Sequence, residues 1–290
     1  MTWEGNRESD NVEDRRSSGG GGMPVFGGRS IGIGTIVIAL VGGWVLGINP
    51  LTILGLLSGG GMPAQVQQAP AQRPPADDTM ARFVSTVLAD TEDVWQAVFR
   101  DGGGRYQEPR LVLFRGATPT ACGTGQAAMG PFYCPADQKV YIDLGFYETL
   151  KSRLGAPGDF AQAYVIAHEV GHHVQHLLGI TSKVDQMRGR VSQKEYNAMS
   201  VRLELQADCF AGVWAHHAQN ARQILEQGDV EEAMNAAARI GDDALQRASG
   251  GAVVPDSFTH GSSAQRQRWF HTGLKQGSVQ ACDTFSARSL

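Results

Sequence analysis

The stretch Ala167-His168-Glu169-Val170-Gly171-His172-His173-Val174-Gln175 decides how the rest of this 290-residue chain is interpreted. It contains the pattern His-Glu-x-x-His, whose spacing has a mechanical meaning. Residues four apart lie on one face of an α-helix, so His168 and His172 can bind one metal ion side by side. Glu169 then stands next to the open position of the metal, where a carboxylate can accept a proton from bound water. The motif therefore predicts a catalytic zinc site, with a His-rich surface helix as the alternative.

The residues around the motif favour a helix. Asp159 and Gln162 form a pair of cap and third residue ahead of an apolar run, and Gly179 lies where the helix should end. His173 points about 100° away from His172, and His176 lies a further turn along. The pattern predicts that His173 and His176 are polar residues on the helix surface, outside the metal site.

A catalytic zinc site needs a third protein ligand. Residues 191–217 have the pattern of one long helix, in which Glu204 and Asp208 are four apart and share a face. Their neighbours are mostly apolar, and a buried carboxylate needs a partner. We therefore expect Glu204 to be the third ligand of Zn²⁺ and Asp208 to accept the free ring N–H of a ligand histidine; a solvated acidic face is the alternative. The rival ligands are Asp185, Glu195 and His216.

Residues 167–175 and Glu204-Leu-Gln-Ala-Asp-Cys-Phe-Ala-Gly212 together resemble the putative neutral zinc metallopeptidase family of bacterial membrane-associated proteins. The resemblance covers nearly the whole chain. It extends over Gly130-Pro-Phe-Tyr-Cys-Pro-Ala-Asp137, Val140-Tyr-Ile-Asp143, Thr259-His-Gly-Ser-Ser-Ala-Gln-Arg266 with Trp269-Phe270, and Ser9-Asp-Asn-Val-Glu-Asp-Arg-Arg16. The resemblance implies a zincin-type fold and peptidase chemistry.

The resemblance also suggests two further roles. Peptidases of the gluzincin type supply a His or Tyr from a late segment to hydrogen-bond the oxyanion, and His260 lies in a comparable late position, in an expected loop ahead of Ser262-Ser263. The alternative is that His260 helps to cap the next helix or packs beside Trp269. In zincins the strand nearest the site pairs with extended substrate, and Val140–Asp143 is the candidate, with a plain core strand as the alternative.

Composition restricts the class of protein. With 42% apolar residues the chain can bury a substantial core, and a net charge of −4 without a basic cluster argues against nucleic acid as a partner. The four cysteines show no Cys-x-x-Cys spacing, so a zinc site made of cysteines is not expected. Cys122 and Cys134 flank a short Gly-rich loop and suit a local disulfide, which leaves Cys209 and Cys282 to pair by default. Free buried thiols are the alternative.

Composition also divides the chain into four regions. Residues 1–29 are polar and Gly-rich, which is typical of a disordered tail. Residues 30–58 are apolar over a length that can cross a bilayer, residues 59–78 form a linker rich in Pro, Gln and Ala, and residues 79–290 form the catalytic domain.

Arginines precede the predicted span and none directly follows it. This asymmetry favours a single-pass membrane protein with a cytoplasmic N-terminus and an extracytoplasmic catalytic domain. A cleaved signal peptide is the competing interpretation.

Within the catalytic domain, the periodicity predicts an α+β, mainly helical, zincin-like fold with a small β-sheet. The expected elements are helices over residues 80–99, over 230–248 with Gly241 as a weak point, and from Ser262-Ser263 to Gly277, and strands over 111–114 and 139–144.

These observations together predict a membrane-anchored zinc metallopeptidase acting on peptides or proteins. Glu169 is the expected general base. One rival is a non-catalytic, zinc-stabilised module that binds a partner at the membrane. A second rival is a zinc hydrolase that cleaves a non-peptide amide, for instance in cell-wall material.

Overall fold

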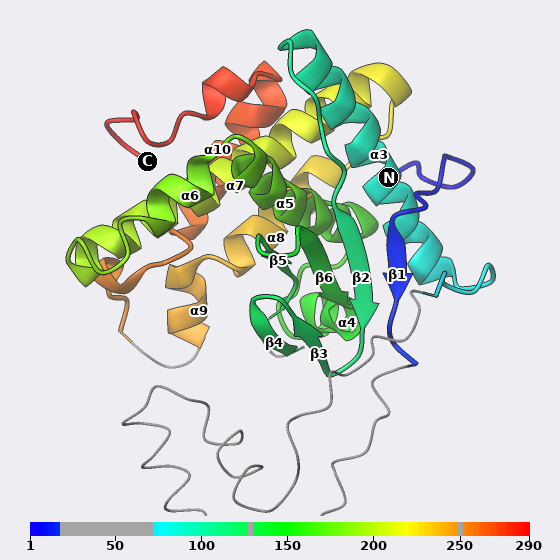
Figure 1. Ribbon diagram of the computed structural model, residues 1–290, viewed down its shortest axis with the longest axis horizontal. Coiled ribbons are helices and arrows are strands. Elements are labelled where there is room, and N and C mark those ends of the chain that lie inside the picture. The colour runs from blue at the N-terminus through cyan, green and yellow to red at the C-terminus, as the bar shows by residue number, and fades with distance from the viewer. Residues whose placement is uncertain (18–71, 127–129, 249–251) are drawn as a thin grey trace, which may run out of the picture. The chain divides into compact units, whose positions relative to one another are not determined.

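A four-stranded sheet with helices packed against it forms the core of the folded unit. The computed structural model describes residues 1–17, 72–126, 130–248 and 252–290 (Figure 1). The sheet has the order β1-β2-β6-β5, in which β2 runs parallel to β1 and β6, and β5 is antiparallel to β6. Its strands are β1 (Val12–Asp14), β2 (Arg110–Phe114), β6 (Lys139–Asp143) and β5 (Phe132–Cys134).

The two faces of the sheet are covered differently. Successive side chains of a strand point to opposite faces, so Leu111 and Leu113 of β2 join the large core shared with the helices, whereas Val112 and Phe114 join a small apolar cluster. A hairpin packs on Phe132 of that small cluster. The hairpin strands are β3 (Ala117–Thr120) and β4 (Gly123–Gln126).

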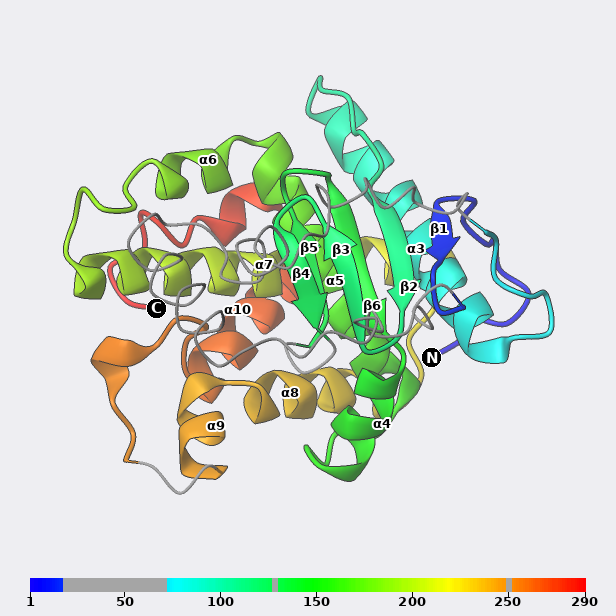
Figure 2. The same cartoon turned by 60° about the horizontal axis from the view of Figure 1, so that its bottom comes forward.

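The helical layer contains the two helices that carry the predicted site. Figures 1 and 2 show α5 (Asp159–Leu177) behind the sheet, with α7 (Gln193–Arg222) packed against it. The described residues also form α3 (Thr79–Asp101), α4 (Gly145–Ser152), α6 (Ile180–Asp185), α8 (Asp229–Arg239), α9 (Asp242–Ala248) and α10 (Ser263–Gln276). The prediction of an α+β, mainly helical domain is confirmed.

Two glycines let the helices around the site approach closely. A Cβ at Gly171 of α5 would lie 2.9 Å from the carbonyl oxygen of Ala207 in α7. A Cβ at Gly212 of α7 would lie 2.1 Å from the carbonyl oxygen of Phe270 in α10. A larger residue at either position would push these three helices apart.

Two predictions about helix boundaries are corrected. α5 follows Gly158, which has φ 121° and offers no side-chain cap, so Asp159 is the first helical residue and not the cap. The helix expected over residues 230–248 is interrupted, and α8 and α9 meet at Gly241. A Cβ at Gly241 would lie 2.5 Å from the backbone nitrogen of Ser263, so this break allows α10 to begin close to α9.

Both predicted disulfides are confirmed. Cys122 bonds to Cys134 and ties the turn of the β3–β4 hairpin to the end of β5. Cys209 bonds to Cys282 and ties α7 to a short 3-10 turn near the C-terminus.

The first seventeen residues are folded, in contrast to the disordered tail predicted over residues 1–29; residues 18–29 lie outside the described residues. β1 pairs with β2 in register, Val12 opposite Leu111, and the Val12 side chain is buried. A three-residue strand among polar neighbours carries almost no periodic signal. Its partner strand also lies far along the chain, so local sequence patterns could not reveal the pairing.

The predicted membrane span, residues 30–58, lies outside the described residues. In the part of the chain that the structure describes, no helix is both long enough and apolar enough to cross a membrane.

Candidate metal centre

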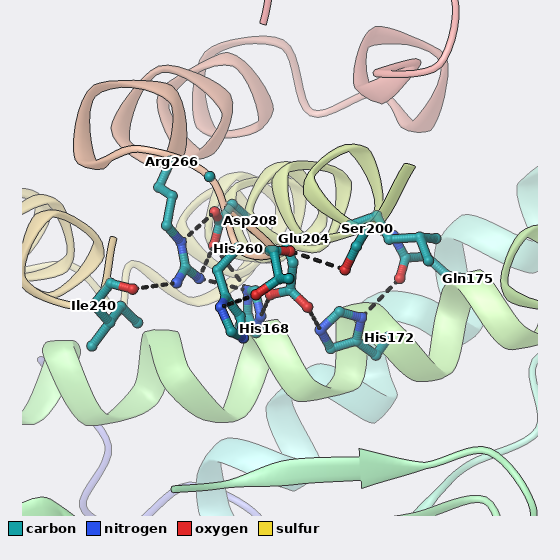
Figure 3. Close-up of polar contacts among 12 residues, drawn as sticks. His168, His172, Gln175, Ser200, Glu204, Asp208, Ile240, His260 and Arg266 are labelled. Atoms are coloured by element: carbon teal, nitrogen blue, oxygen red, sulfur yellow. Dashed lines mark hydrogen bonds and ion pairs between the residues drawn. The ribbon is translucent and has the colours of Figure 1, made fainter. Parts of the chain in front are cut away.

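Three side chains of the types that bind zinc meet across a cavity of about 1060 Å³. α5 supplies His168 and His172, and α7 supplies Glu204 from the facing side (Figure 3). Nε2 of His168 lies 3.3 Å from one Glu204 carboxylate oxygen, and Nε2 of His172 lies 3.5 Å from the other. Tetrahedral ligands with zinc bonds of about 2.0–2.1 Å would be about 3.3–3.4 Å apart. The donor set therefore fits a zinc ion.

The other ring nitrogens of the two histidines are held by hydrogen bonds. Nδ1 of His168 donates to Asp208 at 2.8 Å, and Nδ1 of His172 donates to the side-chain oxygen of Gln175 at 2.9 Å. An ionised carboxylate only accepts, which sets this tautomer for His168 and leaves its Nε2 free to bind a metal. Asp208 thus lies where the sequence predicted it. Gln175 was missed, although it lies three residues after His172 on the same helix.

Asp208 is the centre of a buried polar cluster behind His168. Its carboxylate also accepts the Tyr164 hydroxyl at 2.5 Å and two N–H groups of Arg266, each at 2.8 Å. The Asp208 and Arg266 side chains are 0% and 3% exposed, so their opposite charges compensate each other out of water. Tyr164 could have been found from its spacing, four residues before His168. Arg266 could not, because it comes from α10.

Burial and charge act in opposite directions on the ionisable groups of the centre. Burial alone would lower the pKa of His168, but Asp208 and Glu204 outweigh it and raise that pKa to about 10. Burial would raise the pKa of Glu204, yet the adjacent imidazoles of His172 and His168 hold it well below its ordinary value. The two imidazoles and the Glu204 carboxylate thus share protons in a small space. A bound divalent cation would replace those protons.

Glu169 lines the same cavity and is 7% exposed. Burial raises the pKa of its carboxyl above the ordinary value, although the imidazoles of His168 and His172 oppose the shift. A carboxyl group in this position is suited to taking up a proton and giving it back.

His260 lies in a loop that Asp242 holds in place. One Asp242 oxygen accepts the backbone N–H groups of Thr259, His260 and Gly261 at 2.7, 2.6 and 3.0 Å. The other accepts from Nδ1 of His260 at 3.1 Å, and this bond raises the pKa of His260 although burial opposes it. The imidazole lines the cavity, half exposed, and Figure 3 places it beside Glu204.

Residues 1–285 match the family described as "Putative neutral zinc metallopeptidase". The chain belongs to this family. An uncharacterized protein of Escherichia coli K12, YpfJ, is 53% identical over 292 residues, which is 98% of this chain and 99% of the relative. An uncharacterized protein of Mycobacterium tuberculosis H37Rv, Rv2575, is 42% identical over 221 residues, which is 72% of this chain and 73% of the relative. No solved structure matches the chain.

In this member of the zinc metallopeptidase family, His173 is buried, and the prediction of a surface residue is wrong. Its Nε2–H donates to the carbonyl oxygen of Gln107 at 2.6 Å, and its Nδ1 accepts the Tyr133 hydroxyl at 2.9 Å. Burial lowers the pKa of His173 to about 4, so the ring is neutral above that pH. His173 therefore links α5 to β5 one residue after the candidate ligand His172.

Both β5 and Asp143 at the end of β6 line the cavity, but among the described residues β5 is an edge strand and β6 is not. β6 is hydrogen-bonded to β2 on one edge and to β5 on the other, so the prediction that Val140–Asp143 pairs with substrate is wrong. The cavity-lining residues of β5 are Phe132 and Tyr133. The sequence pointed to β6 because its five residues alternate clearly, whereas the three residues of β5 are too few to show a pattern.

The rival ligands do not join the centre. Glu195 caps the start of α7 through Ser192 at 2.9 Å, and Nδ1 of His216 lies 2.8 Å from the carbonyl oxygen of Leu274. Asp185 lines the cavity but is absent from the ligand group around His168. Glu204 is thus the carboxylate that the described residues bring to the two histidines.

Proposed function

We propose that this chain is a zinc-dependent peptidase that hydrolyses peptide bonds in the cavity between α5 and α7. The observation that carries the proposal is that the ligand atoms of His168, His172 and Glu204 gather within 4.8 Å of one another, with each histidine Nε2 3.3 or 3.5 Å from a Glu204 oxygen, close to the separation of about 3.3–3.4 Å expected for tetrahedral zinc ligands. These atoms lie on the wall of an open cavity. Catalytic zinc sites have three protein ligands and leave the fourth position to water or substrate.

The proposed chemistry divides between the metal and the chain. Zinc held by the three side chains supplies a Lewis acid for the carbonyl and for a water molecule. Glu169 takes the proton of the attacking water and passes it to the leaving amine, which completes hydrolysis without a covalent intermediate. The raised pKa of Glu169 favours its holding the proton between these two steps.

The rival functions receive less support. A purely structural zinc site prefers four protein ligands and needs no adjacent carboxylate. Here the ligand group within the described residues has three members, and Glu169 lines the cavity beside them. A zinc hydrolase of non-peptide amides would use the same chemistry, but β5 is an edge strand among the described residues and two of its residues line the cavity, which favours an extended peptide.

We propose that β5 binds the substrate backbone as an added strand. The Tyr133 hydroxyl connects β5 to His173 on the metal-bearing helix, so this bond sets the distance between the substrate strand and the metal. Tyr133→Phe removes one hydrogen bond worth about 1 kcal/mol, which corresponds to a loss in kcat/KM of roughly fivefold. We expect the loss to appear in KM for long peptides, with zinc content unchanged. A fall in kcat alone, or an equal loss for all substrates together with lower thermal stability, would contradict this role.

His260 is the proposed donor to the oxyanion, with Asp242 orienting it. His260→Phe is expected to keep zinc and thermal stability and to lower turnover by roughly 10²–10³, the scale of one lost oxyanion donor. Asp242→Asn should lower turnover by less than His260→Phe does. In the double variant, Asp242→Asn should lower turnover no further than His260→Phe alone. Additive losses in the double variant would show that Asp242 acts only on the loop fold.

We propose that the domain works outside the cytoplasm, next to a membrane. Its two disulfides support this proposal because disulfides persist in oxidising compartments and are rare in the cytosol.

The test of the proposed function is metal removal and return. Chelated protein should lose cleavage of peptide substrates, and one equivalent of zinc per chain should restore it. A cell-wall amide substrate run in parallel separates the rival hydrolase. Cleavage of peptides that persists in the metal-free protein would exclude the proposal, as would zinc-dependent cleavage of the cell-wall amide alone.

A further inference from the structure

β1 is an integral strand of the sheet that supports the metal centre. Its three residues pair in parallel with Leu111, Val112 and Leu113 of β2. Backbone hydrogen bonds continue on either side of it, from Leu111 N–H to Asn11 at 2.9 Å and from Arg15 N–H to Leu113 at 2.7 Å. The ladder therefore extends beyond the three strand residues, and the N-terminal segment is bonded directly to the strand beside β6.

Ion pairs also hold β1 beside β2. Glu13 of β1 is 4% exposed, and its carboxylate accepts from Lys139 of β6 at 2.9 Å and from Arg110 of β2 at 3.2 Å. Three strands are joined by this one acid. A buried carboxylate without partners is costly, so the sheet favours β1 in place.

The residues before β1 are bonded to α3 in a similar way. Glu92 of α3 is 1% exposed and accepts from the Ser9 hydroxyl at 2.6 Å, the Asn11 amide at 2.9 Å and the Arg7 guanidinium at 3.0 Å. A buried carboxylate on the first helix of the catalytic domain thus takes hydrogen bonds from residues that precede the apolar stretch of the chain.

The chain leaves and re-enters this sheet at one corner. The Asp14 N–H donates to the carbonyl oxygen of Gln72 at 2.7 Å. Arg16 bonds both to Asp14 and to Asp78, the residue that caps α3, each at 2.6 Å. Ser17 and Gln72 therefore bound the intervening stretch of chain on the same side of the domain.

We infer that residues 1–17 and 72–290 lie on the same side of any membrane that the chain meets, so that a single crossing cannot lie between them. Residues 30–58 contain no charged side chain and are mostly apolar, so this stretch is the part of the sequence suited to contact with lipid. The hydrocarbon core of a bilayer is about 30 Å thick. Hydrogen bonds of 2.7–2.9 Å between β1 and β2 cannot extend across it. The N-terminal segment consequently shares the compartment of the metal centre.

Single cysteines test this arrangement in cells that express the full chain. Glu4 and Arg288 are both exposed, and one lies on each side of the apolar stretch. Glu4→Cys and Arg288→Cys are treated with a membrane-impermeant maleimide, before and after permeabilisation, with the unmodified chain as the background. We expect the two variants to behave alike, whether both react in intact cells or both react only after permeabilisation. Reaction of one in intact cells and of the other only after permeabilisation would overturn the inference.

A second measurement addresses the pairing itself. Glu8 and Arg82 of α3 form an exposed ion pair at 2.9 Å, and neither contacts the cavity. In the double variant Glu8→Cys/Arg82→Cys, a short bis-maleimide should join the two positions both in native membranes and in detergent, and neither single variant should form the link. A link that forms in detergent but not in membranes would show that the N-terminal segment is separated from the domain in the membrane, which contradicts the inference.

Discussion

Glu169→Gln is expected to lower the turnover of the zinc-loaded protein at least a hundredfold, the scale of a lost general base. Glutamine keeps the size of the side chain but cannot take up the proton of the attacking water. His168, His172 and Glu204 are untouched, so zinc content and thermal stability should stay as they are. Steady-state kinetics on a peptide substrate, with zinc measured on the same sample, checks this expectation.

The matched control is Glu148→Gln, an exposed position on α4 away from the ligands. It removes the same charge and should leave turnover unchanged. Full activity of Glu169→Gln at full zinc occupancy would show that another group takes the proton, and the proposed chemistry would then be wrong.

Glu204→Gln should bind zinc far more weakly than the unmodified chain, because a neutral amide replaces the charged ligand. Glu195→Gln is the control on the same helix, since Glu195 lies at the exposed cap of α7 and does not reach the histidines. Asp208→Asn should weaken zinc binding by only about ten- to a hundredfold, because Asp208 acts through His168 and not on the metal. Competition with a fluorescent zinc chelator measures all three affinities.

The relative sizes of these losses in zinc affinity identify the third ligand. If Glu204→Gln and Glu195→Gln hold zinc equally well, the third ligand lies elsewhere. If Asp208→Asn keeps its thermal stability and still loses as much affinity as Glu204→Gln, Asp208 is itself a ligand and the assignment of the two carboxylates must be exchanged.

The parts of the centre that follow helical spacing could be predicted. His168 and His172 share a face at four residues apart, and so do Glu204 and Asp208. Local spacing places each pair on its own helix, and the chemistry of zinc then requires the two helices to meet. The close approach at Gly171 shows how they do so.

Residues that act through long-range contacts could not be predicted. Arg266 reaches Asp208 from α10, and Glu13 joins strands that lie about a hundred residues later. Neither contact leaves a periodic pattern in the sequence. His173 was misassigned for a different reason. Spacing shows correctly that it points away from His172, but not that β5 covers that side of the helix.

Mapping cleavage products by mass spectrometry on a mixed peptide library tests the central claim most directly. The zinc-loaded chain is predicted to produce new peptide termini at amide bonds inside the library peptides, and Glu169→Gln at the same zinc content is predicted to produce almost none. The absence of new termini from zinc-loaded protein, or the same products from Glu169→Gln at the same rate, would contradict the claim that this centre hydrolyses peptide bonds.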